Sequence, residues 1–135
     1  MQSKLNLRRG FTIIELLIVM SIMAILISIA VPIYRTHMQH AREAVLKQNL
    51  FTLRSLISQY GLDKQKAPQS LDDLVQAGYL KEIPINPITG QRDWQPVECE
   101  EDTITSPDQQ DQGGICDVHS SSPQIGSNGA AYSTW

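Results

Sequence analysis

Hydrophobic and polar residues are distributed very unevenly along this chain. Residues 11–34 form an apolar run of 24 residues with one charge, Glu15, and no charged residue lies between Leu16 and Val31. At about 1.5 Å rise per residue, an α-helix of this length crosses a hydrocarbon layer of ~30 Å. The pattern therefore predicts a membrane-spanning helix over residues 11–34, preceded by a short basic segment, residues 1–10.

Beyond Pro32 the apolar residues are confined to one side of a helix. They recur at spacings of 4, 3, 4 and 3, at Leu46, Leu50, Leu53, Ile57 and Tyr60. This period predicts that the helix continues to Tyr60 and stops at Gly61, with a length of about 75 Å from Phe11. Such a stripe needs another element to cover it. Residues 35–135 are therefore expected to form one small domain on the second half of the helix.

The rest of the chain predicts short elements. Ser70 and Asp73 resemble a capping box before a helix of about two turns that stops at Gly78. "DWQPVEC", "GICDVHS" and "AAYSTW" read as three short strands. The expected fold class is α+β, a long N-terminal helix packed on a small antiparallel sheet of about three strands. Its core should join the helix stripe to Trp94, Ile115, Val118, Tyr132 and Trp135.

Charge then limits the partners and sets the orientation. Net charge is −3, but residues 82–135 hold nine acids and one base, Arg92, so no nucleic-acid partner is expected. Lys4, Arg8 and Arg9 precede the apolar run. Because basic residues beside a membrane helix stay on the cytoplasmic side, residues 35–135 should lie on the opposite side of the bacterial inner membrane.

The start of the apolar run carries a specific motif. "GFTIIELLIVMSIMAILISIAVP" resembles the class III signal of type IV pilins and type II secretion pseudopilins through Gly10, Phe11, Thr12, Glu15 and Pro32. The resemblance implies that a prepilin peptidase cleaves between Gly10 and Phe11 and methylates the new amino group of Phe11. It also implies that Glu15 pairs with the Phe11 ammonium of a neighbouring subunit during assembly.

The residues themselves support a special role for Glu15. A carboxylate in a spanning segment costs a few kcal/mol and is usually kept for a partner or pathway. The helix macrodipole offsets only roughly 0.3 to 1 kcal/mol of this cost. An intersubunit contact is therefore favoured over simple tolerance. Pro32 is expected to mark a flexible kink, because proline removes a helix hydrogen bond.

A second stretch narrows the resemblance. "SLDDLVQAGYLKEIPINPITG", followed by Trp94, is similar to the αβ-loop of the major, G-type pseudopilins. This implies a non-enzymatic subunit of a helical homo-oligomeric filament in the periplasm, working with an inner-membrane assembly platform and minor pseudopilins. A type IV pilus or competence-type pilin is the first alternative. A membrane-anchored periplasmic enzyme or sensor is the alternative of another class.

Two cysteines and a few weak ligands complete the candidate chemistry. Cys99 and Cys116 are expected to form a disulfide in an oxidising compartment, stabilising the domain by ~3 kcal/mol. His37 and His40 lie three residues apart without further ligands nearby, and are expected to be solvated. The resemblance to G-type pseudopilins implies a calcium-binding loop near the C-terminus, but here Asp117 and Asn128 are its only weak candidate ligands. Calcium needs more carboxylates than this, so no cofactor is expected.

Overall fold

The computed structural model describes residues 10–100 and 113–135. The leader expected at residues 1–10 lies outside this part except for Gly10. Most of residues 100–114, a polar and acidic stretch that the sequence predicts to be a solvent loop, also lies outside it. Helix α1 spans Ile13–Lys64, 52 residues. The expected stop at Gly61 is wrong, because the left-handed residue that ends the helix is Gln65, with φ 56°, and its side chain donates to the Leu62 carbonyl at 3.2 Å.

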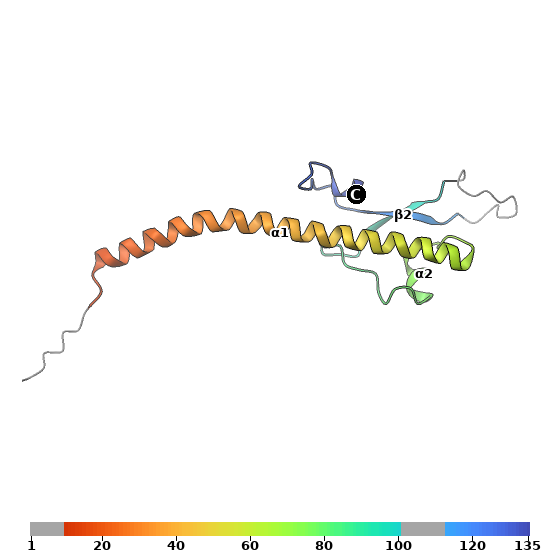
Figure 1. Cartoon of the computed structure of the whole chain (residues 1–135), viewed down its shortest axis with the longest axis horizontal. Coiled ribbons are helices and arrows are strands. Elements are labelled where there is room, and N and C mark those ends of the chain that lie inside the picture. Colours follow the sequence, from red (N-terminus) through yellow and green to blue (C-terminus); the bar gives the residue numbers. More distant parts are fainter. Residues whose placement is uncertain (1–9, 101–112) are drawn as a thin grey trace, which may run out of the picture. The chain divides into compact units, whose positions relative to one another are not determined.

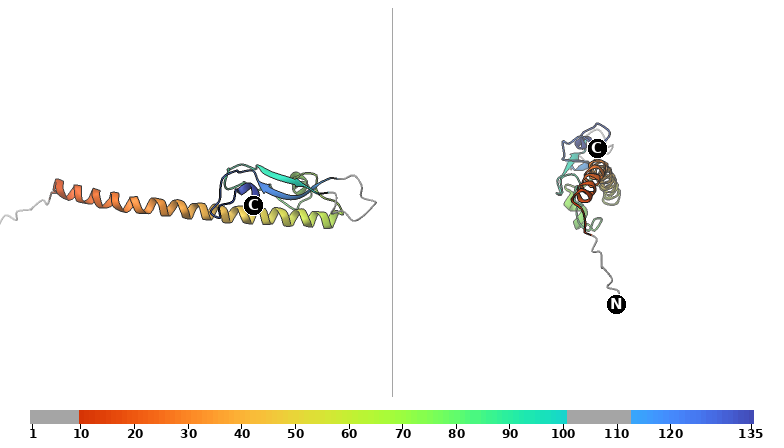
Figure 2. Two further views of the ribbon diagram at one scale, coloured as in Figure 1. Left: turned by 90° about the horizontal axis from the view of Figure 1, so that it is seen from above. Right: turned by 90° about the vertical axis from the view of Figure 1, so that its left-hand side faces the viewer.

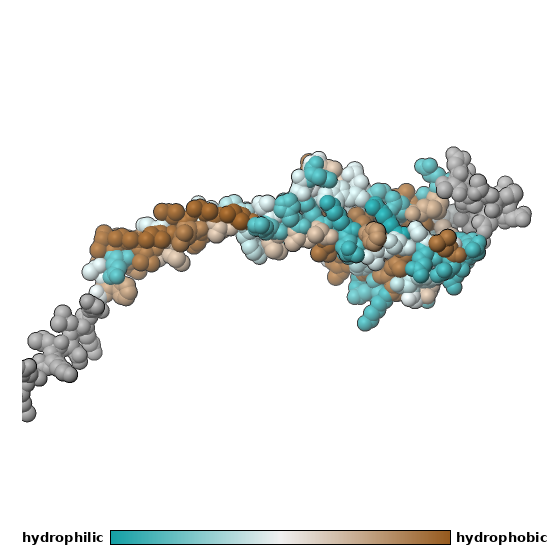
Figure 3. Space-filling model, in the orientation of Figure 1, coloured by the Kyte–Doolittle hydropathy of each residue, from teal (hydrophilic) through white to brown (hydrophobic). Residues whose placement is uncertain are grey.

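The chain divides into two compact units, Met1–Met38 and Gln39–Trp135. In the first, the described residues from Ile13 onward form helix, and its apolar side chains are exposed. Figure 3 shows this stretch as an almost continuous hydrophobic surface. The helix continues through Pro32, and the Thr36 hydroxyl donates to the Pro32 carbonyl at 3.2 Å.

The second unit combines the C-terminal part of α1 with a two-stranded sheet (Figures 1 and 2). Strands β1 (Trp94–Glu98) and β2 (Ile115–Ser120) are antiparallel, pairing Trp94 with Ser120 and Glu98 with Ile115. A register irregularity lies between Val97 and Glu98. The two strands occupy the first two segments predicted as strands.

The short helix α2 (Leu71–Gln76) also has the predicted ends. The Asp73 carboxylate accepts from the Ser70 main-chain N–H at 3.2 Å, as in a capping box, and from that of Gln69 at 2.7 Å. Gly78, with φ 83°, supplies the left-handed conformation after the helix.

The third predicted strand is wrong. Ala131 forms an isolated bridge with Ile125, and the chain then turns into the 3₁₀ helix η2 (Tyr132–Thr134). The Tyr132 N–H donates to the Gln124 carbonyl at 2.9 Å, so this segment pairs with its own preceding loop. The α+β class and the helix-on-sheet packing are confirmed, with two strands in the described residues.

The core joins the helix stripe to the sheet as the sequence predicts. All five stripe residues of α1 are buried, together with residues from α2, both strands and η2. Trp135 packs against this cluster in partly buried form. The buried set comprises Leu46, Leu50, Leu53, Ile57, Tyr60, Leu71, Leu74, Trp94, Ile115, Val118 and Tyr132.

Candidate functional site

The first turn of α1 contains the candidate assembly residues. The Glu15 main-chain N–H donates to the Thr12 hydroxyl at 3.3 Å, and the Leu16 N–H to the Thr12 carbonyl at 3.2 Å. Thr12 therefore caps the helix, and its role is local. The Glu15 side chain is exposed, and no hydrogen bond or ion pair to its carboxylate occurs among the described residues. Phe11 is exposed just before the helix.

Helix α1 is long and apolar enough, by length and composition, to cross a membrane, with a mean hydropathy of 2.8 in its most apolar window. None of that window is buried against the rest of the protein, unlike the core helix of a soluble domain. A hydrophobic surface of this extent needs lipid or other protein around it.

The C-terminal segment is fastened to α1 by a buried carboxylate, Glu43, which is 4% exposed. It accepts from the Ser127 N–H at 2.7 Å and hydroxyl at 2.5 Å, from the Tyr132 hydroxyl at 2.8 Å, and from the Gln39 amide at 3.1 Å. Burial alone would raise the pKa of Glu43, but these hydrogen bonds outweigh it and lower the pKa to about 2. Glu43 is therefore ionised at neutral pH.

A second anchor, Arg54, lies about three turns further along the helix. The Arg54 guanidinium donates to Asp117 Oδ1 at 2.6 Å, to the Val118 carbonyl at 3.0 Å and to the Trp135 main-chain oxygen at 2.9 Å. Burial would raise the pKa of Asp117, but the Val118 N–H and Arg54 outweigh it and lower the pKa. Arg54 thus ties β2 and the segment after η2 to α1.

The loop between α2 and β1 is held by a polar cluster in which Asn86 and Ser120 are buried. The Asn86 amide donates to the Ser120 hydroxyl at 2.9 Å, and the Trp94 indole N–H to the Pro84 carbonyl at 2.8 Å. Asp93 accepts from Thr89 at 2.6 Å and from Ser121 at 2.5 Å. Because the buried Asn86 and Ser120 side chains are each other's partners, they fix the loop against β2.

The disulfide expected between Cys99 and Cys116 is present, with their Cα atoms 4.9 Å apart. It joins the residue after β1 to β2 itself, and the Cys99 N–H also donates to the Gly114 carbonyl at 2.8 Å. This pairing leaves no free thiol in either residue.

The two weak calcium candidates have other partners. Asp117 binds Arg54, and the Asn128 side-chain oxygen accepts from the Ala130 N–H at 3.0 Å. Residues 10–100 and 113–135 contain no group of three or more His, Cys, Asp or Glu side chains that could hold a metal. His40 is exposed, as the sequence predicts, but its Nδ1 also lies 3.8 Å from Glu43 Oε2.

Sequence reasoning missed Glu43 and Arg54 as anchors. The signal for Glu43 was its position three residues before Leu46, on the apolar side of the helix, where a charge needs a partner. No comparable signal marks Arg54, which stands beside the stripe like an ordinary surface residue.

Comparisons with known proteins bear on the N-terminal segment first. Residues 5–31 match the prokaryotic N-terminal methylation motif. The chain is also similar to type II secretion system core protein G of Pseudomonas aeruginosa, 30% identical over 94 residues, and to that of Escherichia coli, 28% identical over 96 residues. These alignments cover 58% and 59% of this chain and 66% of each relative, just under two thirds of its length.

A third relative comes from another kind of system. The competence protein ComGC of Halalkalibacterium halodurans is 27% identical over 81 residues, covering 60% of this chain and 79% of that protein. Together, the motif and these relatives support a type IV pilin-like protein. No solved structure matches this chain. The exposed apolar part of α1 is the part long and apolar enough to cross a membrane, and Glu43 and Arg54 hold the C-terminal segment to the rest of the helix.

Proposed function

We propose that the chain is a structural subunit of a type II secretion pseudopilus. In this proposal the protein is inserted in the inner membrane by residues 11–34, with residues 35–135 in the periplasm. A prepilin peptidase removes residues 1–10 and methylates Phe11. The subunit then joins a helical filament on an assembly platform, with minor pseudopilins, and the filament supports protein export. Catalysis by the subunit is not required.

One observation carries the proposal: the methylation-motif match over residues 5–31 includes Gly10 and Phe11 just before α1 and Glu15 in its first turn, and the apolar window of this helix has no buried residue. The similarity to the two core proteins G supports the secretion system over other pilin-like systems. The cystine and the acidic C-terminal half suit a domain in an oxidising compartment without nucleic-acid contacts.

Glu15 is assigned to assembly on physical grounds. An exposed carboxylate at the start of a lipid-facing helix is costly, and a neighbour's ammonium at Phe11 would remove that cost. Thr12 already caps the helix, so capping does not require the Glu15 side chain. Because the Glu15 carboxylate has no partner in lipid, it favours transfer of the subunit from the lipid into the filament.

A competence-type or type IV pilus pilin is the second candidate. It is favoured by the similarity to the competence protein, of which this chain covers 79%. The two functions differ in their loss phenotype. Deletion of the gene should abolish export of folded proteins in the first case, and DNA uptake, adhesion or motility in the second.

Filament assembly tests the proposal. Wild-type protein, co-expressed with a secretion assembly platform and prepilin peptidase, should form sedimentable filaments seen by electron microscopy. Glu15→Ala should be processed but remain in the membrane fraction. The matched control is Asp72→Asn, an exposed acid of α2, which should assemble normally. Normal filaments from Glu15→Ala would remove the role assigned to Glu15, and absence of wild-type filaments would overturn the proposed function.

A further inference from the structure

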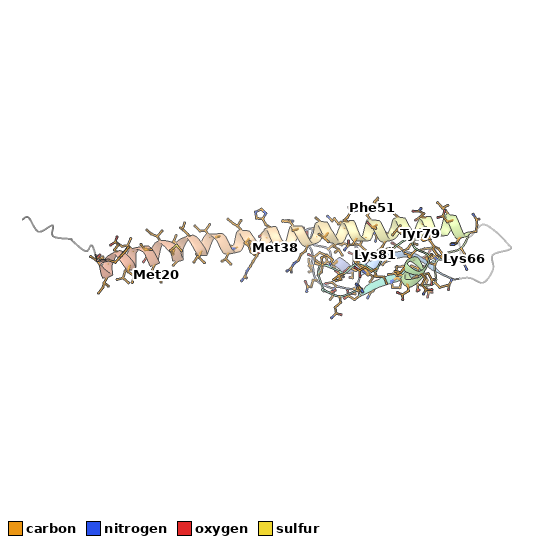
Figure 4. The ribbon with its side chains drawn as sticks, turned by 90° about the horizontal axis from the view of Figure 1, so that it is seen from below. Met20, Met38, Phe51, Lys66, Tyr79 and Lys81 are labelled. Carbon is orange, nitrogen blue, oxygen red and sulfur yellow. A yellow bond between two sulfur atoms is a disulfide. The ribbon has the colours of Figure 1, made fainter. Side chains whose placement is uncertain are left out.

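An exposed aromatic side chain stands on the face of α1 that points away from the sheet. Phe51 is 67% exposed, and Figure 4 shows it on that side of the helix. It borders a groove of about 380 Å³, which is also lined by Leu50 and Trp135. Lys47 and Arg54 line the same groove, so it is apolar inside and basic at its rim.

The uncompensated positive charge at this groove is that of Lys47, because the Arg54 guanidinium is paired with Asp117. Lys47 lies with Nζ 4.7 Å from the centre of the Trp135 ring and forms no ion pair within the described residues. A ligand for this groove should therefore combine an apolar group with carboxylates.

The same chain carries such a surface at the end of β1. Val97 is 39% exposed, and Glu98 and Glu100 are exposed without an ion pair in the described part of the chain. β1 pairs with β2 alone among the described strands, so its other edge is open. From Trp94 to Gly114 the sequence contains six acids and no lysine or arginine.

We propose that the groove beside Phe51 of one copy binds residues 97–100 of a second copy, which are the end of β1 and the two residues after it. Phe51 packs against Val97, and Lys47 faces the acids that follow it. The two surfaces differ, so the contact is heterologous and can repeat along an open helical filament. The inference rests on the proposed function, because it names one contact between the subunits of the proposed filament. The charges of Lys47 and of the acids opposite it determine how the two copies align and which partner is chosen.

Photo-cross-linking tests the contact directly. Benzoylphenylalanine replaces Phe51 in the full-length protein, in membranes that contain the assembly system, with unlabelled and ¹⁵N-labelled copies mixed. The expected product joins residue 51 of one copy to the tryptic peptide that begins at Asp93 of a differently labelled copy. Digestion with a Glu-specific protease should place the cross-link near Val97. Cross-links only to lipid, to another protein or within one copy would overturn the inference.

A charge exchange provides an independent test. Lys47→Glu and Glu98→Lys should each lower filament yield about fivefold, and the double variant should restore it. Lys81→Glu, an exposed lysine outside the groove, is the control and should leave the yield unchanged. Unaffected single variants, or a double variant no better than either, would contradict the contact.

The two proposals fail in different ways. If wild-type filaments form while residue 51 cross-links elsewhere, the inference fails and the proposed function stands. If wild-type protein forms no filaments, the proposed function fails. The isotope-mixed cross-link in membranes still decides whether two copies meet through this groove.

Discussion

The Tyr132 hydroxyl donates a hydrogen bond of 2.8 Å to the Glu43 carboxylate, across 89 positions of sequence. This contact links the segment around η2 to the long helix. Because Ser127 donates twice to the same carboxylate, the loop after β2 is held at two points. The domain thus depends on one buried acid in the helix that also carries the membrane segment.

Replacing Glu43 with Gln should destabilise the domain. Gln keeps the side-chain volume but cannot accept at both of its terminal atoms, so donors of Ser127 or Tyr132 lose a partner. We expect a loss of roughly 2 to 3 kcal/mol in the free energy of unfolding. Urea denaturation of the full chain in detergent, followed by tryptophan fluorescence, measures it. Glu82→Gln, at an exposed ion pair, is the control, and equal stability of the two variants would contradict the anchor.

The contribution of Glu43 should disappear in acid. Its pKa falls from 4.5 in the unfolded chain to about 2 in the fold, so its stabilisation is present above pH 4.5 and is lost as the pH falls towards 2. Its size is about 3 kcal/mol at neutral pH. The stability difference between wild type and Glu43→Gln, measured from pH 7 to pH 2, should therefore shrink below pH 4.5. A constant difference would show that Glu43 does not titrate as described.

Gly126 lies so close to two aromatic rings that a larger residue at this position should destabilise the domain. A Cβ atom there would lie 2.8 Å from Trp135 Cζ2 and 2.9 Å from Tyr132 Cε1. Gly126→Ala should cost about 1 to 3 kcal/mol, because the rings must move. Gly61→Ala is the matched control: it meets no atom within 4 Å inside α1 and should stabilise the helix by about 0.5 to 1 kcal/mol. Thermal denaturation of both variants tests the contrast, and a neutral Gly126→Ala would contradict the close packing.

The disulfide should contribute strongly to so small a domain. Cys99→Ser with Cys116→Ser should lower the free energy of unfolding by about 3 kcal/mol, since the bond closes a loop in the unfolded chain. Wild type with reductant should match the double variant in denaturation, and reductant should not affect the double variant. If reductant leaves wild-type stability unchanged, the bond has no such role.

Sequence periodicity predicted the parts of the fold that depend on repetition. The stripe from Leu46 to Tyr60 identified the buried face of α1, and the cap at Ser70 and Asp73 identified α2. The helix end was misplaced because Gln65, a residue with no special preference for positive φ, supplies the left-handed turn. The third strand was wrong because its backbone hydrogen bonds go to the neighbouring loop.

The anchors could not be predicted in the same way. Glu43 and Ser127 are 84 positions apart, and nothing in either local pattern specifies the other. Arg54 reaches three different main-chain or side-chain oxygens, a geometry that exists only once β2 and the last residues have packed. By contrast, the membrane segment and the motif around Glu15 are local and could be recognised from sequence.

Mass spectrometry of the N-terminus tests the central claim most directly. Protein is isolated from membranes with an active prepilin peptidase and digested with trypsin, which cuts after Arg9 and Arg35. Processed protein should yield the peptide of residues 11–35 with one methyl group on the Phe11 nitrogen, and a strain without the peptidase should yield residues 10–35 unmethylated. Recovery of the peptide beginning at Gly10 as the main product, with the peptidase active, would contradict the assignment as a filament subunit.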